Sequence, residues 1–174
     1  MKIDIRQILW DHFGSLKDEE TRLPMGKDYF IFYVVPGILG SISFFKSLSF
    51  DKDAYNVSIT FFGIFIALLL NIQVAIFSIY QRKWKDSEIE AEKDAYNYEL
   101  NMRRRLLGQL NSNISYLVLV CCASLILSIS CYIGALFISF PSAILVFLYA
   151  HFVLTLLMIV KRAHALFQRE YAEP

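Results

Sequence analysis

The sequence has 174 residues, of which 56% are hydrophobic and 19% are charged, and its net charge is +1. Soluble domains contain about 25% charged residues, so this composition is typical of a membrane protein and not of a soluble domain. The balance of charge also excludes a chain that is a polycation for nucleic acid along its whole length.

The N-terminal arm, residues 1–28, is polar overall but has one apolar helical face. Four apolar residues recur at helical spacing: Ile5, Leu9, Phe13 and Leu16. Such a period is typical of an amphipathic helix. We expect this face to lie against the inner surface of the membrane or against the central segment of the chain.

Four apolar runs have the length needed to cross a hydrocarbon core, about 20 residues. They are residues 29–48, 57–80, 115–138 and 142–160. Pro36 and Gly37 predict a bend in the first span, and Ser139-Phe140-Pro141 predicts a helix start just before the fourth. The sequence therefore predicts an all-α integral membrane protein with a four-transmembrane-helix bundle.

The second span carries small and polar residues on one helical face, which we call the second-span stripe. Its members follow one another at steps of three or four residues: Thr60, Gly63, Ala67, Asn71, Ala75 and Ser78. In one interpretation the stripe packs helices closely, with Asn71 bonding across the contact. In the other it lines a narrow polar path in an oligomer, with Asn71 near the membrane midplane.

The central segment, residues 81–114, is rich in helix formers and contains Gly108 but no proline. Its apolar residues recur at helical spacing, so we expect a helical insert with one apolar face between the second and third spans.

Arginines 103 to 105 form a basic triad near the end of this insert: Arg103, Arg104 and Arg105. Such a triad is typical of an anchor that touches acidic lipid headgroups. The alternative is a cytoplasmic site for a polyanion, such as a nucleotide or single-stranded nucleic acid, to which Arg22, Lys27 or Lys85 would contribute.

The third and fourth spans also contain polar groups. In the third, Ser124 and Ser128 belong to a second stripe of small residues, which predicts tight helix contacts or a pore lining. In the fourth, His151 would be costly without a partner. It is either a neutral histidine hydrogen-bonded inside the bundle or a group that senses protons or faces a pore.

Lysine and arginine are distributed very unevenly around the spans. Fifteen lie in the arm, the insert and the tail, against Lys46 and Lys52 in the first short loop. Because cytoplasmic segments carry the excess, both termini and the insert are predicted to be cytoplasmic, in a multi-pass protein of the inner membrane. The predicted order is arm (1–28), two spans (29–80), insert (81–114), two spans (115–160) and cytoplasmic tail (161–174).

Motifs for catalysis are missing from the sequence. It has no glycine-rich phosphate loop, no metal-ligand spacing and no nucleophile elbow, and all 16 acidic residues lie outside the four spans. We therefore expect a protein that is not an enzyme and that needs no cofactor and no metal.

A short four-span chain with a charged helical insert and no catalytic motif resembles the small membrane effectors of bacterial anti-phage defence systems, among them the Hailong-type effector. The resemblance covers the whole chain as architecture and transfers no site residue. Effectors of this kind are held inactive until infection and then compromise the inner membrane. The resemblance thus implies a gated homo-oligomer.

Together these features predict an oligomeric membrane effector that forms a gated pore or disrupts the inner membrane, under control from the cytoplasmic side. The alternative is a non-conducting membrane anchor or regulatory subunit that recruits a cytoplasmic partner. Expected partners are membrane lipids, further copies of the chain, and a cytoplasmic nucleotide, nucleic acid or operon partner protein.

Overall fold

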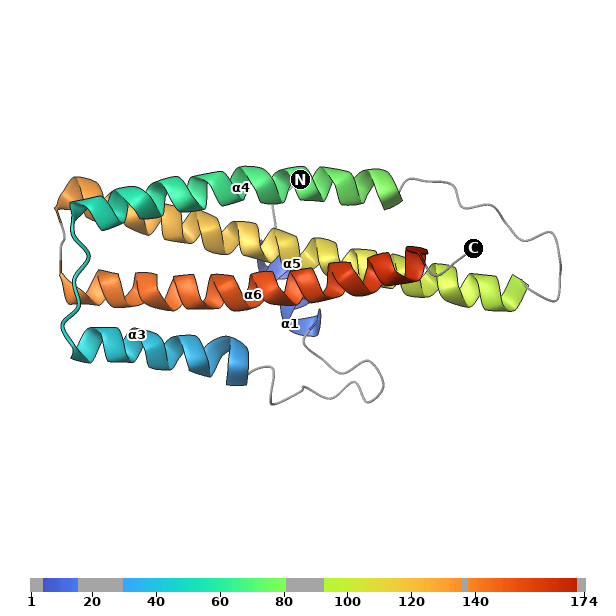
Figure 1. Cartoon of the computed structure of the whole chain (residues 1–174), viewed down its shortest axis with the longest axis horizontal. Coiled ribbons are helices and arrows are strands. Elements are labelled where there is room, and N and C mark those ends of the chain that lie inside the picture. Colours follow the sequence, from blue (N-terminus) through green and yellow to red (C-terminus); the bar gives the residue numbers. More distant parts are fainter. Residues whose placement is uncertain (1–4, 16–29, 81–92, 136–137, 172–174) are drawn as a thin grey trace.

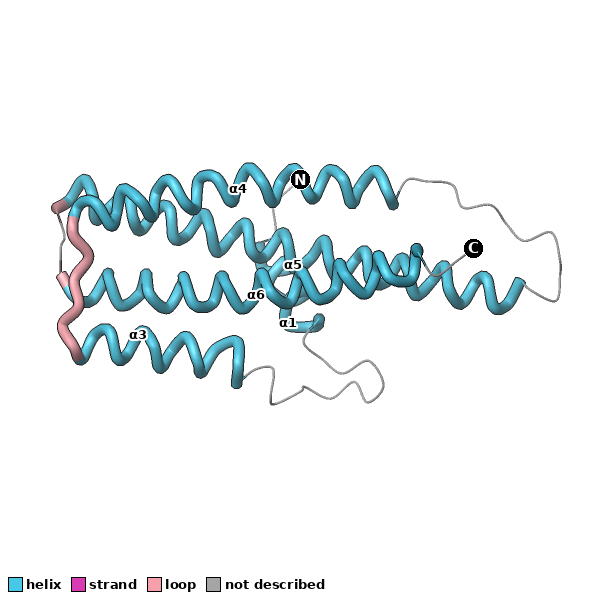
Figure 2. Tube along the Cα trace, viewed as in Figure 1, coloured by secondary structure: helices cyan, strands magenta, loops and turns pink. Residues whose placement is uncertain are grey.

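The structure is a computed structural model that describes residues 5–15, 30–80, 93–135 and 138–171. These residues are helical apart from short connections (Figure 2), which confirms the all-helical prediction for this part of the chain. The elements are α1 (Ile5–Ser15), the π-helix η1 (Phe30–Val34), α3 (Val35–Phe45), α4 (Lys52–Tyr80), α5 (Lys93–Gly134) and α6 (Ser139–Tyr171). The three long helices α4, α5 and α6 run side by side, α3 lies along α6, and α1 lies across the bundle near its middle (Figure 1).

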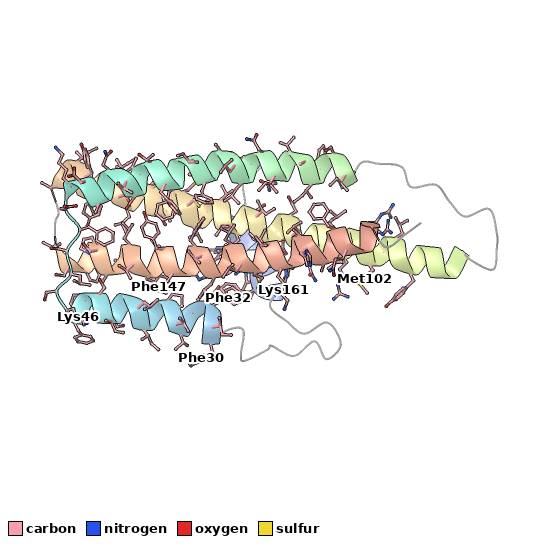
Figure 3. The ribbon with its side chains drawn as sticks, viewed as in Figure 1. Phe30, Phe32, Lys46, Met102, Phe147 and Lys161 are labelled. Atoms are coloured by element: carbon pink, nitrogen blue, oxygen red, sulfur yellow. The ribbon has the colours of Figure 1, made fainter. Side chains whose placement is uncertain are left out.

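Three of the described helices are long and apolar enough to cross a membrane. Their apolar stretches are Lys52–Ile79, Leu100–Gly134 and Ser139–Gln168. From its start to Lys161, α6 has no charged residue, a distance of about 33 Å against about 30 Å of hydrocarbon. Figure 3 shows Lys46 at one end of the bundle and Lys161 past the opposite end of α3. The uncharged part of the bundle therefore has the thickness of a bilayer core.

The first predicted span ends earlier than expected. Its described helical part, Phe30–Phe45, is about 24 Å long, which is less than the hydrocarbon thickness. The helix ends because Ser47 adopts φ 52°, and the Leu48 amide donates to the Ser43 carbonyl at 3.0 Å. Hydropathy extends the span to residue 48 but does not detect this left-handed turn.

Near Pro36, where a bend was expected, the helix changes from π to α geometry. The π-helix η1 ends immediately before α3, in which Pro36 lies in the first turn. Proline has no amide hydrogen and its ring displaces the carbonyl four residues earlier, so a regular α-helical bond across this position is impossible. The wider π turn at Phe30–Val34 accommodates that loss.

The predicted insert and third span belong to one helix. Residues 93–114 are helical, as expected, but α5 continues without a break through residue 114 and ends at Gly134, where Ala135 has φ 50°. The prediction of a third span that reaches residue 138 is therefore wrong by one turn. Residues 81–92, where the insert was expected to begin, lie outside the described ranges.

The core of the bundle forms where α4, α5 and α6 meet. From α4 it contains Phe62, Leu69 and Ile76, which lie two turns apart and therefore share one face. They belong to the same buried cluster as Leu117 of α5 and Phe152 of α6. This cluster defines the face of α4 that turns toward the chain's own core.

At the end of the bundle where α4 begins, Ser142 joins three segments. Its hydroxyl donates to the Ile138 carbonyl (3.0 Å) and accepts the Phe50 amide (2.8 Å). Since its single hydrogen is used, the Tyr55 hydroxyl is the donor in their 3.2 Å contact. These bonds fix the α3–α4 connection against the start of α6, where the predicted helix start at Ser139 is confirmed.

Gly40 allows α3 to approach α6 closely. A Cβ atom there would lie 3.1 Å from the Ala143 carbonyl oxygen and 3.2 Å from Phe147 Cβ, whereas one at Gly37 would meet nothing within 4 Å. We predict that Gly40→Ala lowers the free energy of unfolding in detergent by about 1–3 kcal/mol relative to Gly37→Ala, because only Gly40→Ala overpacks the contact. Both changes share the same gain in helix propensity. Equal thermal unfolding midpoints for the two variants would contradict this packing.

Candidate functional site

The second-span stripe lies on the face of α4 that points away from the core. Thr60, Ala67, Asn71 and Ser78 are exposed, and Gly63 is half-buried. Leu69, at the centre of the buried face, precedes Asn71 by two residues, which is about 200° around the helix. Thr60, Ala67, Asn71 and Ser78 therefore lie nearly opposite the α4 core face. Gly63 lies closer to α5, where a Cβ atom on it would be 3.8 Å from Leu125 Cδ1.

Hydrogen bonding separates Asn71 from the other polar members of the stripe. The Thr60 hydroxyl donates to the Asn56 carbonyl (3.1 Å) and the Ser78 hydroxyl to the Ala75 carbonyl (2.8 Å). The Asn71 side chain has no hydrogen-bond partner among the described residues. Asn71 is thus the member whose polar group needs a partner from outside.

Gln73 of the same helix shows how a polar group in this region is satisfied within the chain. Its Nε2 donates to Asn111 Oδ1 (3.2 Å) and to the Ser115 hydroxyl (2.6 Å), both on α5. A polar side chain only two residues from Asn71 is thereby bonded across the α4–α5 contact, while Asn71 faces the other way.

Ser124 and Ser128 of the third-span stripe lie in the interior of the chain. Both are fully buried, and each donates to a carbonyl one turn earlier, Val120 and Ser124 respectively, at 2.8 Å. A side chain in this position lets neighbouring helices approach and leaves no hydroxyl group unbonded. The arrangement favours helix packing over pore lining for these two residues in a single chain.

His151 is held by two hydrogen bonds inside the bundle. Its Nδ1 donates to the Phe32 carbonyl oxygen at 2.8 Å, because a carbonyl can only accept. Its Nε2 lies 2.7 Å from the Tyr116 hydroxyl, which donates to the neutral ring. A neutral imidazole satisfied on both nitrogens is what a histidine within a membrane span requires.

His12 is the functional candidate that sequence reasoning missed. It is fully buried, its ring stacks on Tyr116 with centroids 3.7 Å apart and planes 6° from parallel, and its Nδ1 donates to Asn113 Oδ1 at 2.9 Å. We call the connected set His12, Asn113, Tyr116, His151 and Phe32 the His12 network. It joins α1, α5, α6 and η1, so the N-terminal arm is connected to three elements of the bundle.

The face by which α1 binds differs from the predicted one. Ile5 and Leu9 are 51% and 36% exposed, whereas Ile8 packs against the core and His12 is buried. Ile5 and Leu9 thus do not pack against α5, whereas Phe13 is half-buried, with its ring centroid 5.8 Å from that of Tyr33. On α5, a flat tyrosine ring and an amide contact the imidazole of His12 instead. Contact of Ile5 and Leu9 with the membrane surface stays a prediction. The fourth residue of the predicted face, at position 16, lies outside the described ranges.

Burial lowers the pKa of His12 from 6.5 to about 4, with further lowering from the positive charge of Arg162 and from His151 nearby, while the bond to Asn113 acts in the opposite direction. The docked arm therefore holds His12 in its neutral form at neutral pH. Protonation of the ring favours release of α1, since the charged form is better solvated outside the bundle.

The arginine triad does not form one surface. Arg103 is buried, whereas Arg104 and Arg105 are exposed, and consecutive helical residues point about 100° apart. Arg22 and Lys27, the other residues proposed for an anionic ligand, lie outside the described ranges. Among the residues that the structure describes, the three arginines of the triad thus do not form one basic cluster.

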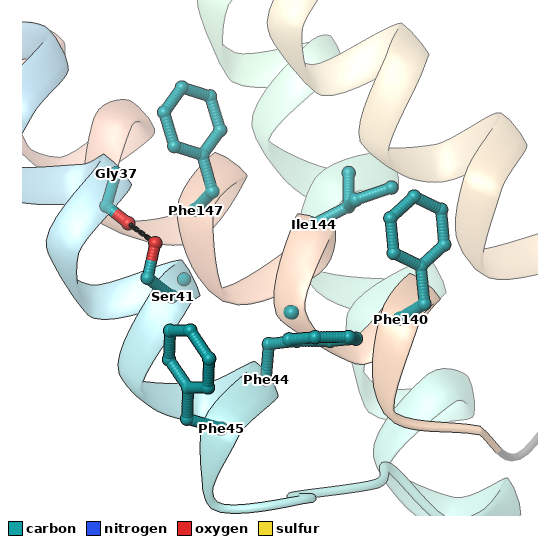
Figure 4. Close-up of a pocket in the computed structure, with 9 residues that line it drawn as sticks. Gly37, Ser41, Phe44, Phe45, Phe140, Ile144 and Phe147 are labelled. Atoms are coloured by element: carbon teal, nitrogen blue, oxygen red, sulfur yellow. Dashed lines mark hydrogen bonds between the residues drawn. The ribbon is translucent and has the colours of Figure 1, made fainter.

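An apolar pocket of about 360 Å³ lies between α3 and α6. Figure 4 shows the rings of Phe44, Phe140 and Phe147 around it, with the Ser41 hydroxyl bonded to the Gly37 carbonyl at 2.8 Å. Its lining contains no charged side chain, so it offers no group that would fix an anion.

No family model matches the sequence, and no curated protein and no solved structure matches the chain. Within the described ranges, no three histidine, cysteine, aspartate or glutamate residues gather as metal ligands would.

The His12 network predicts a pH dependence for docking of the arm. Since the docked pKa is about 4 and the ordinary value 6.5, stability of the docked arm is complete above about pH 6.5 and decreases as pH falls toward 4, by up to about 3 kcal/mol. We expect amide hydrogen exchange in residues 5–15, corrected for the intrinsic effect of pH, to accelerate over this range. His12→Gln should remove the dependence. The same pH profile in both proteins would contradict the role of His12.

Proposed function

We propose that the chain is a homo-oligomeric membrane effector whose copies meet through the second-span stripe and form a gated pore or otherwise permeabilise the inner membrane. In this proposal the short helix Phe30–Phe45 is the fourth crossing element, both termini are cytoplasmic, and the arm controls the pore from the cytoplasmic side. The resemblance to anti-phage effectors suggests a role in defence.

The outward direction of Asn71 is the observation that carries the proposal. In a single chain its amide would face lipid, where an unsatisfied polar group costs about 1–3 kcal/mol or more. A second copy of the chain removes that cost by offering a hydrogen-bond partner, and a polar path between copies removes it with water. Both outcomes require an oligomer.

The other members of the stripe support close approach of another helix. Ala67 is small and exposed, and the hydroxyls of Thr60 and Ser78 are bonded to their own helix. Such a surface lets backbones come close without leaving further polar groups unbonded. The core face of α4, by contrast, is covered by α5 and α6.

Control from the cytoplasmic side is assigned to α1. The arm is bonded to α5 through His12 and Asn113, and Tyr116 and His151 extend this connection to α6 and η1. Docking and release of α1 therefore change the surroundings of three elements at once. A trigger needs only a few kcal/mol of differential affinity to shift such an equilibrium.

Positive charge supports the proposed orientation. The end of the bundle where α4 ends is also where α5 begins and α6 ends (Figure 1), and the predicted basic excess lies on that side. A cytoplasmic nucleotide, nucleic acid or operon partner that binds there could act on α1 directly.

Conductance in planar bilayers tests the proposal. We expect the full chain to conduct, a variant lacking residues 2–27 to conduct more, and Asn71→Leu to lower conductance about tenfold or more in both, because it removes the polar group from the path. Ile72→Leu, on an exposed neighbouring face, is the matched control and should leave conductance unchanged. Inserted wild-type protein and deletion variant that both pass no ions would contradict the pore and favour the anchor or regulatory subunit.

A further inference from the structure

A second cavity, of about 350 Å³, lies between α4 and α5 at the end of the bundle where α4 ends. From α5 it is lined by Arg104, Leu107, Gly108 and Asn111, whose spacing of three, four and seven residues places them on one helical face. From α4 it is lined by Ile76 and Phe77.

The polar part of this cavity offers unused hydrogen-bond donors. Arg104 is exposed and forms no ion pair or hydrogen bond with any residue that the structure describes. Asn111 accepts a bond from Gln73 through its Oδ1, which leaves its Nδ2 donors outside that bond. A cation and an amide two turns apart thus face the same space.

The remainder of the lining is apolar. Leu107 and Ile76 are nearly buried, whereas Phe77 is 60% exposed and forms an open side of the cavity. A free phosphate or nucleotide has no hydrocarbon chain that would pack against these side chains. A ligand that combines an anionic head with a hydrocarbon chain complements both parts.

The depth of the cavity in the bilayer fits such a ligand. At about 43 Å, α4 exceeds the hydrocarbon thickness of about 30 Å by about 13 Å, which is about four residues, or one turn, at each end. Ile76 and Phe77 then lie at the edge of the hydrocarbon. Arg104, on the side of the cavity toward the end of α4, lies among the headgroups.

We propose that this cavity binds an anionic phospholipid from the leaflet at which α4 ends, with its phosphate at Arg104 and one acyl chain along Ile76, Phe77 and Leu107. The guanidinium pairs with the phosphate through charge-assisted hydrogen bonds, and the chain covers apolar surface at the α4–α5 contact. The site is distinct from the second-span stripe and does not depend on conduction.

Two independent changes test the site in the purified full-length protein. Arg104→Gln removes the cation. Gly108→Leu keeps the charge but fills the cavity, because a Cβ at Gly108 meets no atom within 4 Å. Arg105→Gln is the matched control, since it removes the same charge from the adjacent exposed position, which does not line the cavity.

Bound lipid is counted by native mass spectrometry during titration with dioleoylphosphatidylglycerol and, separately, dioleoylphosphatidylcholine. We expect phosphatidylglycerol to bind about tenfold more tightly than phosphatidylcholine, and both test variants to weaken its binding about tenfold, with a change below about twofold for the control. Equal loss in Arg104→Gln and Arg105→Gln with none in Gly108→Leu would overturn the proposal in favour of general surface charge. Full displacement of the lipid by millimolar inorganic phosphate would also overturn it, in favour of a free-anion site.

Discussion

Inside a bilayer no water is present to satisfy a polar group, so each one must find its partner in protein, and this constraint organises the described bundle. The hydroxyls of Ser124 and Ser128 donate hydrogen bonds to carbonyls of their own helix, and both ring nitrogens of His151 form hydrogen bonds. Gln73 bonds across to α5. Against this background Asn71 differs, because its amide points away from the chain that carries it.

The same constraint explains how the arm is attached. Burial of His12 removes an imidazole from water, and the bundle compensates with an amide oxygen at Asn113 and the flat face of Tyr116. Burial disfavours the protonated ring, although the bond to Asn113 acts in the opposite direction. The burial of His12 therefore makes docking of α1 sensitive to the charge of the ring, as the proposed release of α1 requires.

Sequence periodicity predicts the features that repeat along one helix, such as the second-span stripe and the helix start at Ser139. It does not predict features that depend on distant partners. Asn113 follows His12 by 101 residues, so no local pattern in the sequence links the two side chains. The charged residue Asp11 next to His12 indicates a solvent-exposed segment, and the apolar periodicity therefore predicted that Ile5 and Leu9 form the packed face. A histidine four residues after Ile8, at helical spacing, was the only local signal. The left-handed turn at Ser47 ends the first span early, and the hydropathy of the sequence does not indicate this turn.

The central claim is that another copy of the chain covers the second-span stripe, and the mass of the assembly released from lipid nanodiscs tests it most directly. The account predicts a wild-type mass of several times 20.2 kDa. It also predicts that Ala67→Leu reduces this mass toward one copy, while Ile72→Phe, which adds bulk to the same helix on another exposed face, leaves it unchanged. A single copy in the wild type, or the same multiple in all three folded proteins, would contradict the claim.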